Sequence, residues 1–154
     1  MAQDQQAGKR KPGTPGAFSR WMQKTMNARM NRKIRKGKAK FMGMDVLILH
    51  TVGRRSGEPR ETPVAYWAEG EDSRVIIGSG GGSQHPDWYA NLAAHPEKAS
   101  IELPGSENMP VTPRTLDGDD REQVWQRIAE DQPRIAKYQG KSDRQYPLVR
   151  LTGR

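Results

Sequence analysis

The sequence contains no cysteine among its 154 residues. Without thiols the chain forms no disulfide, no thiolate metal site and no cysteine-ligated iron–sulfur cluster, and it has no cysteine nucleophile. Any redox chemistry must therefore come from a bound organic cofactor or from haem. Hydrophobic residues are also few, at 33% against 29% charged residues. This balance is lean for a compact domain and indicates that part of the chain does not enter the core.

Long apolar runs are missing as well. No run approaches the roughly 18 residues needed to span a bilayer, and the first residues lack the apolar segment of a signal peptide. We therefore expect a cytoplasmic protein whose membrane contact, if any, is peripheral. The three histidines, His50, His85 and His95, show no metal-ligand spacing, and no Gly-x-Ser-x-Gly motif marks a serine nucleophile. Neither a metal centre nor a serine hydrolase is expected.

Positive charge is concentrated at the N-terminal end. Residues 1–40 hold twelve Lys and Arg and one acid, Asp4, a net charge of +11, so the rest of the chain carries −3 of the total of +8. A length of 154 residues suits one domain. We expect residues 1–16, rich in Gln, Gly, Pro and Lys, to be a disordered basic tail, and residues 41–154 to form one folded domain.

A basic amphipathic helix is predicted for residues 17–40. Its apolar residues recur at steps of three and four positions, with Lys and Arg between them. They are Phe18, Trp21, Met22, Met26, Met30 and Ile34. Two interpretations fit: the apolar side packs on the domain while the charges stay solvated, or it contacts an anionic membrane surface. Nucleic-acid binding is disfavoured, because no base-stacking aromatics or nucleic-acid-binding motif accompany the charges.

From residue 45 onward the chain consists of short runs typical of strands, separated by Gly- and Pro-rich turns. The predicted strands are 46–52, 62–68, 74–78, 99–103, 110–116 and 147–151. Two stretches, 86–95 and 119–130, are predicted to be helices, the second breaking near Pro133. Strands and helices do not alternate regularly. We therefore expect an α+β fold built on a mostly antiparallel β-barrel.

An arginine-rich turn lies between the first two predicted strands. Residues 53–60 read Gly-Arg-Arg-Ser-Gly-Glu-Pro-Arg, and we call this segment the arginine turn. One interpretation is a solvated basic loop. The other is a pocket in which the guanidinium groups, the Ser56 hydroxyl and turn N–H groups bind phosphate or carboxylate oxygens. The spacing is not that of a Walker phosphate-binding loop.

A glycine-rich segment follows the third predicted strand. Residues 78–86 read Gly-Ser-Gly-Gly-Gly-Ser-Gln-His-Pro, which lets a ligand lie directly against backbone N–H groups. The segment leads into the helix predicted from Pro86, whose N-terminus favours negative charge. Alone, it also fits a flexible surface loop. Its position one strand away from the arginine turn favours a shared binding site.

Together, residues 47–63 and 79–92 resemble the deazaflavin-dependent nitroreductase family of actinobacteria, which includes F420H2-dependent quinone reductases. The resemblance covers residues 44–152. It implies a split β-barrel of the flavin-reductase kind with flanking helices. It also implies binding of coenzyme F420, a two-electron hydride carrier with a phosphodiester and oligoglutamate tail. The expected activity is hydride transfer from the reduced deazaflavin to a quinone such as menaquinone or to another small organic acceptor.

The resemblance also implies roles for individual residues. Those that match the positions meeting the anionic tail are Arg54, Arg55, Ser56 and Arg60. Those that match the stretch lining the deazaflavin are Pro63, Ser79, Gly80, Gly81, Gln84, His85, Pro86, Trp88 and Asn91. A lipid-soluble quinone would also give the basic helix a use, as a contact with the inner face of the cell membrane.

The chain departs from the family at residues 132–138. Prodrug-activating relatives carry three tyrosines there that shape the acceptor site, and this chain keeps only Tyr138. Tyr138 is the candidate catalytic residue, as a substrate contact or proton donor, although a tyrosine at the barrel rim is an equal alternative. Two further functions stay open from the residues: a split barrel that binds FMN or haem, and a non-catalytic membrane-associated module.

Overall fold

The computed structural model describes the chain except for residues 1–16, 38–39 and 81–83. The predicted basic tail and Gly81 lie outside the described residues. No helix in the described part is long and apolar enough to cross a membrane.

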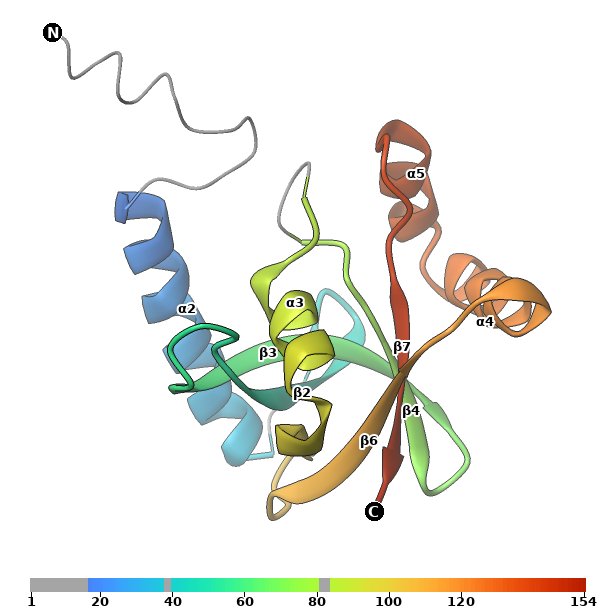
Figure 1. The fold of residues 1–154 in the computed structure, drawn as a ribbon. Coiled ribbons are helices and arrows are strands. Elements are labelled where there is room, and N and C mark those ends of the chain that lie inside the picture. Colours follow the sequence, from blue (N-terminus) through green and yellow to red (C-terminus); the bar gives the residue numbers. More distant parts are fainter. Residues whose placement is uncertain (1–16, 38–39, 81–83) are drawn as a thin grey trace, which may run out of the picture.

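Six antiparallel strands form a closed barrel (Figure 1). They are β2 (Met44–Val52), β3 (Pro59–Glu69), β4 (Ser73–Ile77), β5 (Ser100–Glu102), β6 (Met109–Thr115) and β7 (Leu148–Gly153). Their order is β2-β3-β4-β7-β6-β5, and pairing of β5 with β2 closes the ring. A short strand β1 (Lys40–Phe41) extends the start of β2. The α+β barrel expected from the sequence is confirmed, and each predicted strand overlaps one of the six.

Strand β2 is buried on both faces, which explains its nearly continuous apolar sequence. Leu47 and Leu49 point into the barrel, where they pack with Ile101 from β5. Val46 and Ile48 alternate to the outer face and pack under the N-terminal helix. This outer layer fixes the helix on the barrel.

The N-terminal helix α2 (Ala17–Arg35) lies along the outer face of β2 and β3 (Figure 1). Its C-terminal half is anchored by Ile34, which is fully buried. Farther along the helix toward its N-terminus, Met22 and Met26 are 43% and 62% exposed. The helix ends before the predicted boundary at residue 40, because Gly37 adopts a left-handed φ of 84° and donates its N–H to Ile34.

Three further helices cover the barrel: α3 (Asp87–Ala94), α4 (Gly118–Asp131) and α5 (Pro133–Lys141). A 3-10 turn, η1 (Pro96–Lys98), follows α3. Helix α4 is joined to the barrel by Arg150, which donates to the carboxylates of Glu69 and Asp120. Helix α5 was not predicted. Pro133 ends α4 as expected, but it also occupies the first turn of α5, where its missing N–H costs nothing.

A charged cluster fastens the end of α2 to the barrel. Arg35 donates to Glu61 at 2.8 Å and to both carboxylate oxygens of Glu102 at 2.8 and 3.0 Å. His50 Nε2 lies 2.5 Å from Glu102. The structure thus places a histidine beside two carboxylates, a grouping that sequence spacing did not reveal. Because the Arg35 guanidinium pairs with both carboxylates, the cluster attaches α2 to strands β3 and β5.

Replacing Arg35 by Met should lower the free energy of unfolding by about 1–2 kcal/mol at neutral pH, because two carboxylates lose their cation. The Arg35 hydrogen bond lowers the pKa of Glu102 from 4.5 to about 2. The stabilisation is therefore complete above pH 4.5 and lost as the pH falls towards 2. Urea unfolding of the wild type and Arg35→Met from pH 7 to pH 3 measures the difference, with Lys33→Met as the control. If wild type and Arg35→Met differ in unfolding free energy by the same amount at pH 7 and at pH 3, this account is contradicted.

Candidate functional site

The arginine turn is a tight β2–β3 hairpin whose backbone is closed by its glycines. Gly53 N–H donates to Glu58 and Gly57 N–H donates to Gly53, both at 2.9 Å. Gly57 has φ = 71°, a conformation that favours glycine. The Ser56 hydroxyl accepts the N–H of Glu58 at 3.1 Å. The turn is therefore a defined structure that can present its side chains at fixed positions.

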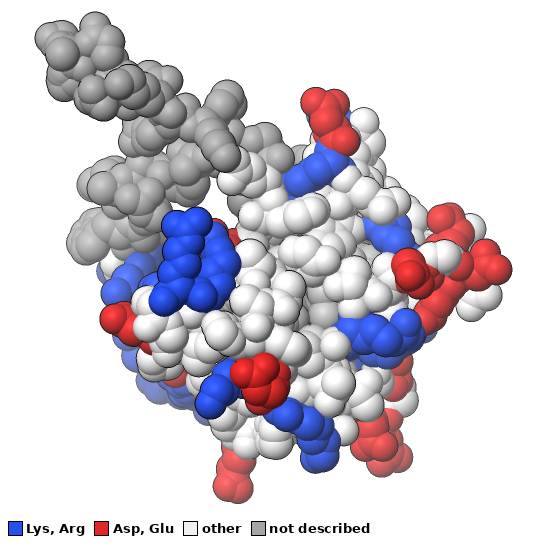
Figure 2. All heavy atoms as spheres, in the orientation of Figure 1, with Lys and Arg blue, Asp and Glu red and all other residues white. Residues whose placement is uncertain are grey.

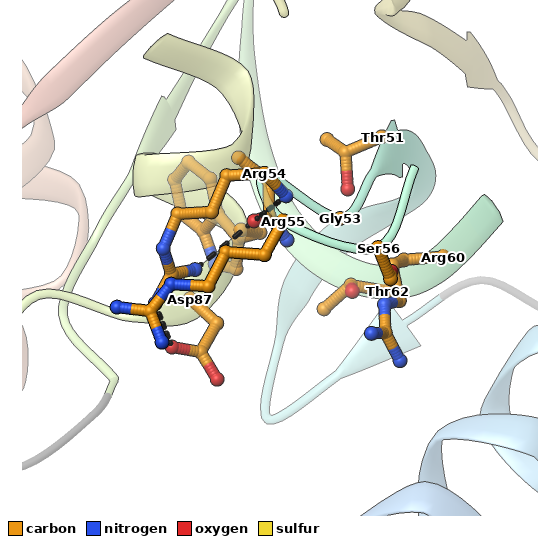
Figure 3. Close-up of a pocket in the computed structure, with 10 residues that line it drawn as sticks. Thr51, Gly53, Arg54, Arg55, Ser56, Arg60, Thr62 and Asp87 are labelled. Carbon is orange, nitrogen blue, oxygen red and sulfur yellow. Dashed lines mark hydrogen bonds and ion pairs between the residues drawn. The ribbon is translucent and has the colours of Figure 1, made fainter. Parts of the chain in front are cut away.

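Arg54 joins the turn to helix α3. Its backbone N–H and its Nη1 both donate to the side-chain oxygen of Asn91 at 3.0 Å. Asn91 is 5% exposed, so a buried carboxamide holds the turn in place. Arg54 also reaches Asp87 at 3.5 Å, a weak contact with an exposed carboxylate. Figure 3 shows Arg54 and Arg55 extending to the Asp87 side of the turn, with Arg60 and Ser56 on the other side.

A cleft of about 450 Å³ opens between the turn and α3. Its lining residues are Thr51, Gly53, Arg54, Arg55, Ser56, Arg60, Thr62, Asp87, Trp88 and Asn91. Six of these are residues that the sequence analysis assigned to the coenzyme. The fold therefore brings the arginine turn and helix α3 together at one cleft.

The cleft is positively charged, and some of its polar side chains lack a hydrogen-bond partner among the described residues. Within the described part of the chain, the side chains of Arg55 and Arg60 have no hydrogen bond or ion pair, and Asp87 is the single acid in the lining. Thr51 is only 4% exposed, yet its hydroxyl oxygen finds no partner among the described residues. Buried hydroxyls are normally hydrogen-bonded. These unused guanidinium and hydroxyl groups fit a ligand with several anionic oxygens.

Lys and Arg side chains gather at the edge where α2 and the arginine turn lie, and Asp and Glu are more frequent on the opposite side (Figure 2). An anion approaching the cleft therefore meets a favourable field.

The structure describes residues 78–80 and 84–86 of the glycine-rich segment, and none of these lines the cleft. Ser79, Gly80, Gln84 and His85 are exposed. Pro86 precedes α3, where Trp88 packs into both the core and the cleft wall. Pro63 is placed differently: it pairs with Ile48, and its side chain shares the outer face of the barrel with Ile48.

Tyr138 lies apart from the cleft. It is on α5, 54% exposed, and not among the residues that line the cleft. Arg134, one turn earlier on α5, contacts the sulfur of Met42 at 3.9 Å. Met42 itself is 53% exposed. The structure therefore puts Tyr138 outside the cleft, on the helix whose Arg134 meets the β1–β2 turn.

Sequence reasoning missed two residues. Thr51 was predicted only as part of the strand 46–52, and Arg144 was given no role. In the structure Arg144 donates to the carbonyl oxygens of Gly78, Ser79 and Gly80. No pattern in the sequence marks this contact, because more than 60 positions separate the partners.

Gly53→Ala tests how tightly the turn is built. A Cβ at this position would lie 2.5 Å from the Ser56 hydroxyl and 3.4 Å from Arg60, so the hydroxyl must leave its hydrogen bond to Glu58. We expect unfolding free energy to fall by about 1–2 kcal/mol, measured by urea denaturation. The control is Gly140→Ala on α5, where nothing lies within 4 Å of the new Cβ; it should stabilise by about 0.5–1 kcal/mol. If Gly53→Ala were as stable as the wild type, the close packing of Gly53 against Ser56 would be refuted.

Comparison with known proteins shows the family to which the chain belongs. The family model described as F420H2-dependent quinone reductase matches residues 21–153. An F420H2-dependent quinone reductase of Mycobacterium tuberculosis strain H37Rv is 29% identical over 149 residues, covering 89% of this chain and 99% of that protein. A solved F420-H2 dependent reductase, FDR-A, superposes with a TM-score of 0.58 at 30% identity over 69% of this chain and 92% of that one.

The haem storage protein HutZ from Vibrio cholerae shares the fold at a TM-score of 0.54, with 19% identity over 80% of this chain and 87% of that one. At 19% identity the similarity concerns the fold alone, so it does not support haem binding by this chain. The family match covers the arginine turn, the glycine-rich segment and all six barrel strands. The chain therefore belongs to the F420H2-dependent quinone reductase family, a family of oxidoreductases that use coenzyme F420.

Proposed function

We propose that this enzyme reduces a quinone with reduced coenzyme F420 and that the arginine turn binds the anionic tail of the coenzyme. The observation that carries the proposal is the cleft between the turn and α3. It combines the guanidinium groups of Arg55 and Arg60 with the hydroxyl of Thr51, none of which has a partner among the residues that the structure describes. Phosphodiester and carboxylate oxygens are the ligands that such donors prefer.

The three arginines have different tasks in this proposal. Arg54 is held by Asn91 and sets the position of the turn. Arg55 and Arg60, which have no protein partner within the described residues, donate to the tail. The Ser56 hydroxyl already accepts the Glu58 N–H, which leaves its own hydrogen free to donate to a tail oxygen.

The deazaflavin is proposed to lie beyond the tail, along Ser79, Gly80, Gln84, His85 and Pro86. When bound, the reduced coenzyme supplies a hydride, and the quinone takes that hydride and one proton to become a hydroquinone. Trp88 and Asn91 fix α3 at the junction of the two parts.

Menaquinone is the acceptor that we propose, and the basic helix α2 is the way to reach it. Quinones of this class are dissolved in the membrane. The N-terminal half of α2 exposes Met22 and Met26, with Lys24, Arg29 and Arg32 on the same helix. Apolar side chains flanked by cations are typical of helices that lie on anionic membrane surfaces. The enzyme would then act peripherally, on the cytoplasmic face of the membrane.

The combined substitution of Arg54, Arg55 and Arg60 by Ala should weaken binding of oxidised coenzyme F420 at least about 100-fold, or about 2.7 kcal/mol. Deazaflavin fluorescence in a titration measures the Kd. A matched variant with Lys98, Arg127 and Lys141 changed to Ala loses the same charge outside the cleft and should bind as the wild type does. Equal affinity of the two triple variants would refute the proposed tail site.

Membrane contact is tested with point variants, because Ile34 and Arg35 of α2 belong to the fold and deletion of the helix would disturb the barrel. The double variant Met22→Gln, Met26→Gln should bind phosphatidylglycerol vesicles with about tenfold lower affinity, or about 1.4 kcal/mol less binding free energy, measured by sedimentation. The control is Met42→Gln, an exposed methionine that is not part of α2, which should sediment normally. Unchanged sedimentation of the double variant would exclude this face of α2 as the membrane contact.

A further inference from the structure

Arg144 lies in the segment between α5 and β7, and its guanidinium group faces the carbonyl oxygens of the glycine-rich segment. Nη1 donates to Gly78 at 2.9 Å, and Nη2 donates to Ser79 at 3.3 Å and to Gly80 at 2.6 Å. Three successive carbonyl groups thus point to one cation. An arginine suits this task because its planar fork carries five donors, whereas a lysine would present a single point of charge.

The direction of these carbonyl groups fixes the direction of the neighbouring N–H groups. In a planar trans peptide the C=O of one residue and the N–H of the next point in opposite directions. The N–H groups of Ser79 and Gly80 therefore point away from Arg144. Neither N–H has a hydrogen-bond acceptor within the described part of the chain. Nothing lies within 4 Å of a Cβ built on Gly80, so space beside this backbone is open.

Arg144 also determines which nitrogen of His85 carries a proton. Its Nη1 lies 3.1 Å from His85 Nδ1. Arginine can only donate, so Nδ1 must accept, and the proton of the neutral imidazole is on Nε2. Burial, and then the charge of Arg144, lowers the pKa of His85. His85 also meets the ring of Tyr89 edge-on at 5.2 Å, and the nearby acid Asp87 contacts Arg54 instead.

Arg144 is itself held firmly. Its guanidinium lies over the ring of Tyr146, 4.9 Å from the centroid. Its backbone carbonyl accepts from Gln139 at 2.8 Å. Beside it, Gly78 N–H donates to Pro147 at 2.9 Å. Residues 78–80 are therefore attached to the α5–β7 connection.

We propose that Arg144 is the positioning residue of the active site. It turns the N–H groups of Ser79 and Gly80 and the Nε2–H of His85 outward as a set of donors for a carbonyl oxygen of a conjugated ring. This inference rests on the proposed function, which puts such a ring beside the segment. The oxygen belongs either to the deazaflavin or to the quinone. A quinone oxygen gains negative charge when hydride arrives, and fixed donors stabilise that charge without reorganisation.

The first test uses the coenzyme-free protein. Imidazole nitrogen NMR of the wild type should show His85 as the Nε2–H tautomer, assigned by the signal lost in His85→Gln. In Arg144→Gln the pKa of His85 should rise towards its ordinary value, because the neighbouring positive charge is gone. Arg121→Gln is the matched control, since Arg121 donates to the Tyr146 carbonyl without reaching His85. An unchanged tautomer and titration in Arg144→Gln would overturn the proposal, whatever the coenzyme proves to be.

The second test separates the two sources of the oxygen. If the donors bind the deazaflavin, Arg144→Gln should weaken binding of oxidised coenzyme F420 at least tenfold. If they bind the quinone, Arg144→Gln should leave that Kd unchanged and lower kcat with menadione at least tenfold. Arg121→Gln should change neither. Normal Kd and normal kcat in Arg144→Gln would reject the positioning role. A wild type that fails to bind the coenzyme would instead reject the proposed function.

Chemical rescue distinguishes loss of the guanidinium group from a general disturbance of the fold. In Arg144→Ala, guanidinium ions at concentrations well below those that denature proteins should restore the lost binding or turnover, whereas methylammonium should not. If Arg144→Gln does not fold, Arg144→Lys takes its place, with the same tautomer and titration measured. Loss of function that guanidinium does not restore in a folded Arg144→Ala protein would count against the proposal.

Discussion

The carboxamide of Asn91 determines the geometry on which the whole site depends. It is buried, and its single oxygen accepts two hydrogen bonds from Arg54, one from the backbone and one from the guanidinium. The contact spans a hairpin and a helix that are 37 positions apart in the chain. Because a buried oxygen that loses its donors is costly, the turn and α3 stay together, and the cleft between them keeps its width.

Arg35 and Arg144 repeat this principle elsewhere in the fold. Arg35 fastens α2 to β3 and β5 through two carboxylates. Arg144 fastens the glycine-rich segment to the α5–β7 connection through three carbonyl oxygens. In each case one guanidinium joins segments that do not share a β-sheet pairing. The basic residues of this chain therefore divide into those that build the site and those left available to an anionic ligand.

The sequence predicted the barrel because its signals are local. The apolar run of β2 is followed by a glycine turn, and the other strands are bounded in the same way. Helix α5 escaped prediction because Pro133 was taken only as a helix breaker. Strand β1 escaped because its turn uses Met42 at φ = 53°, a conformation rare for methionine. The contacts of His50 and Arg144 join distant segments, which no local pattern encodes. The arginine turn and the glycine-rich segment stood out from their residues alone, and the family resemblance added the coenzyme that they are expected to bind.

The central claim is that the arginine turn recognises the anionic tail rather than the ring. The most direct measurement compares the Kd of intact coenzyme F420 with that of the same deazaflavin lacking the phosphodiester and the glutamates. The account predicts that the truncated compound binds at least about tenfold more weakly, or about 1.4 kcal/mol, and that added salt narrows the difference. Equal affinity for the two compounds at low salt would contradict it.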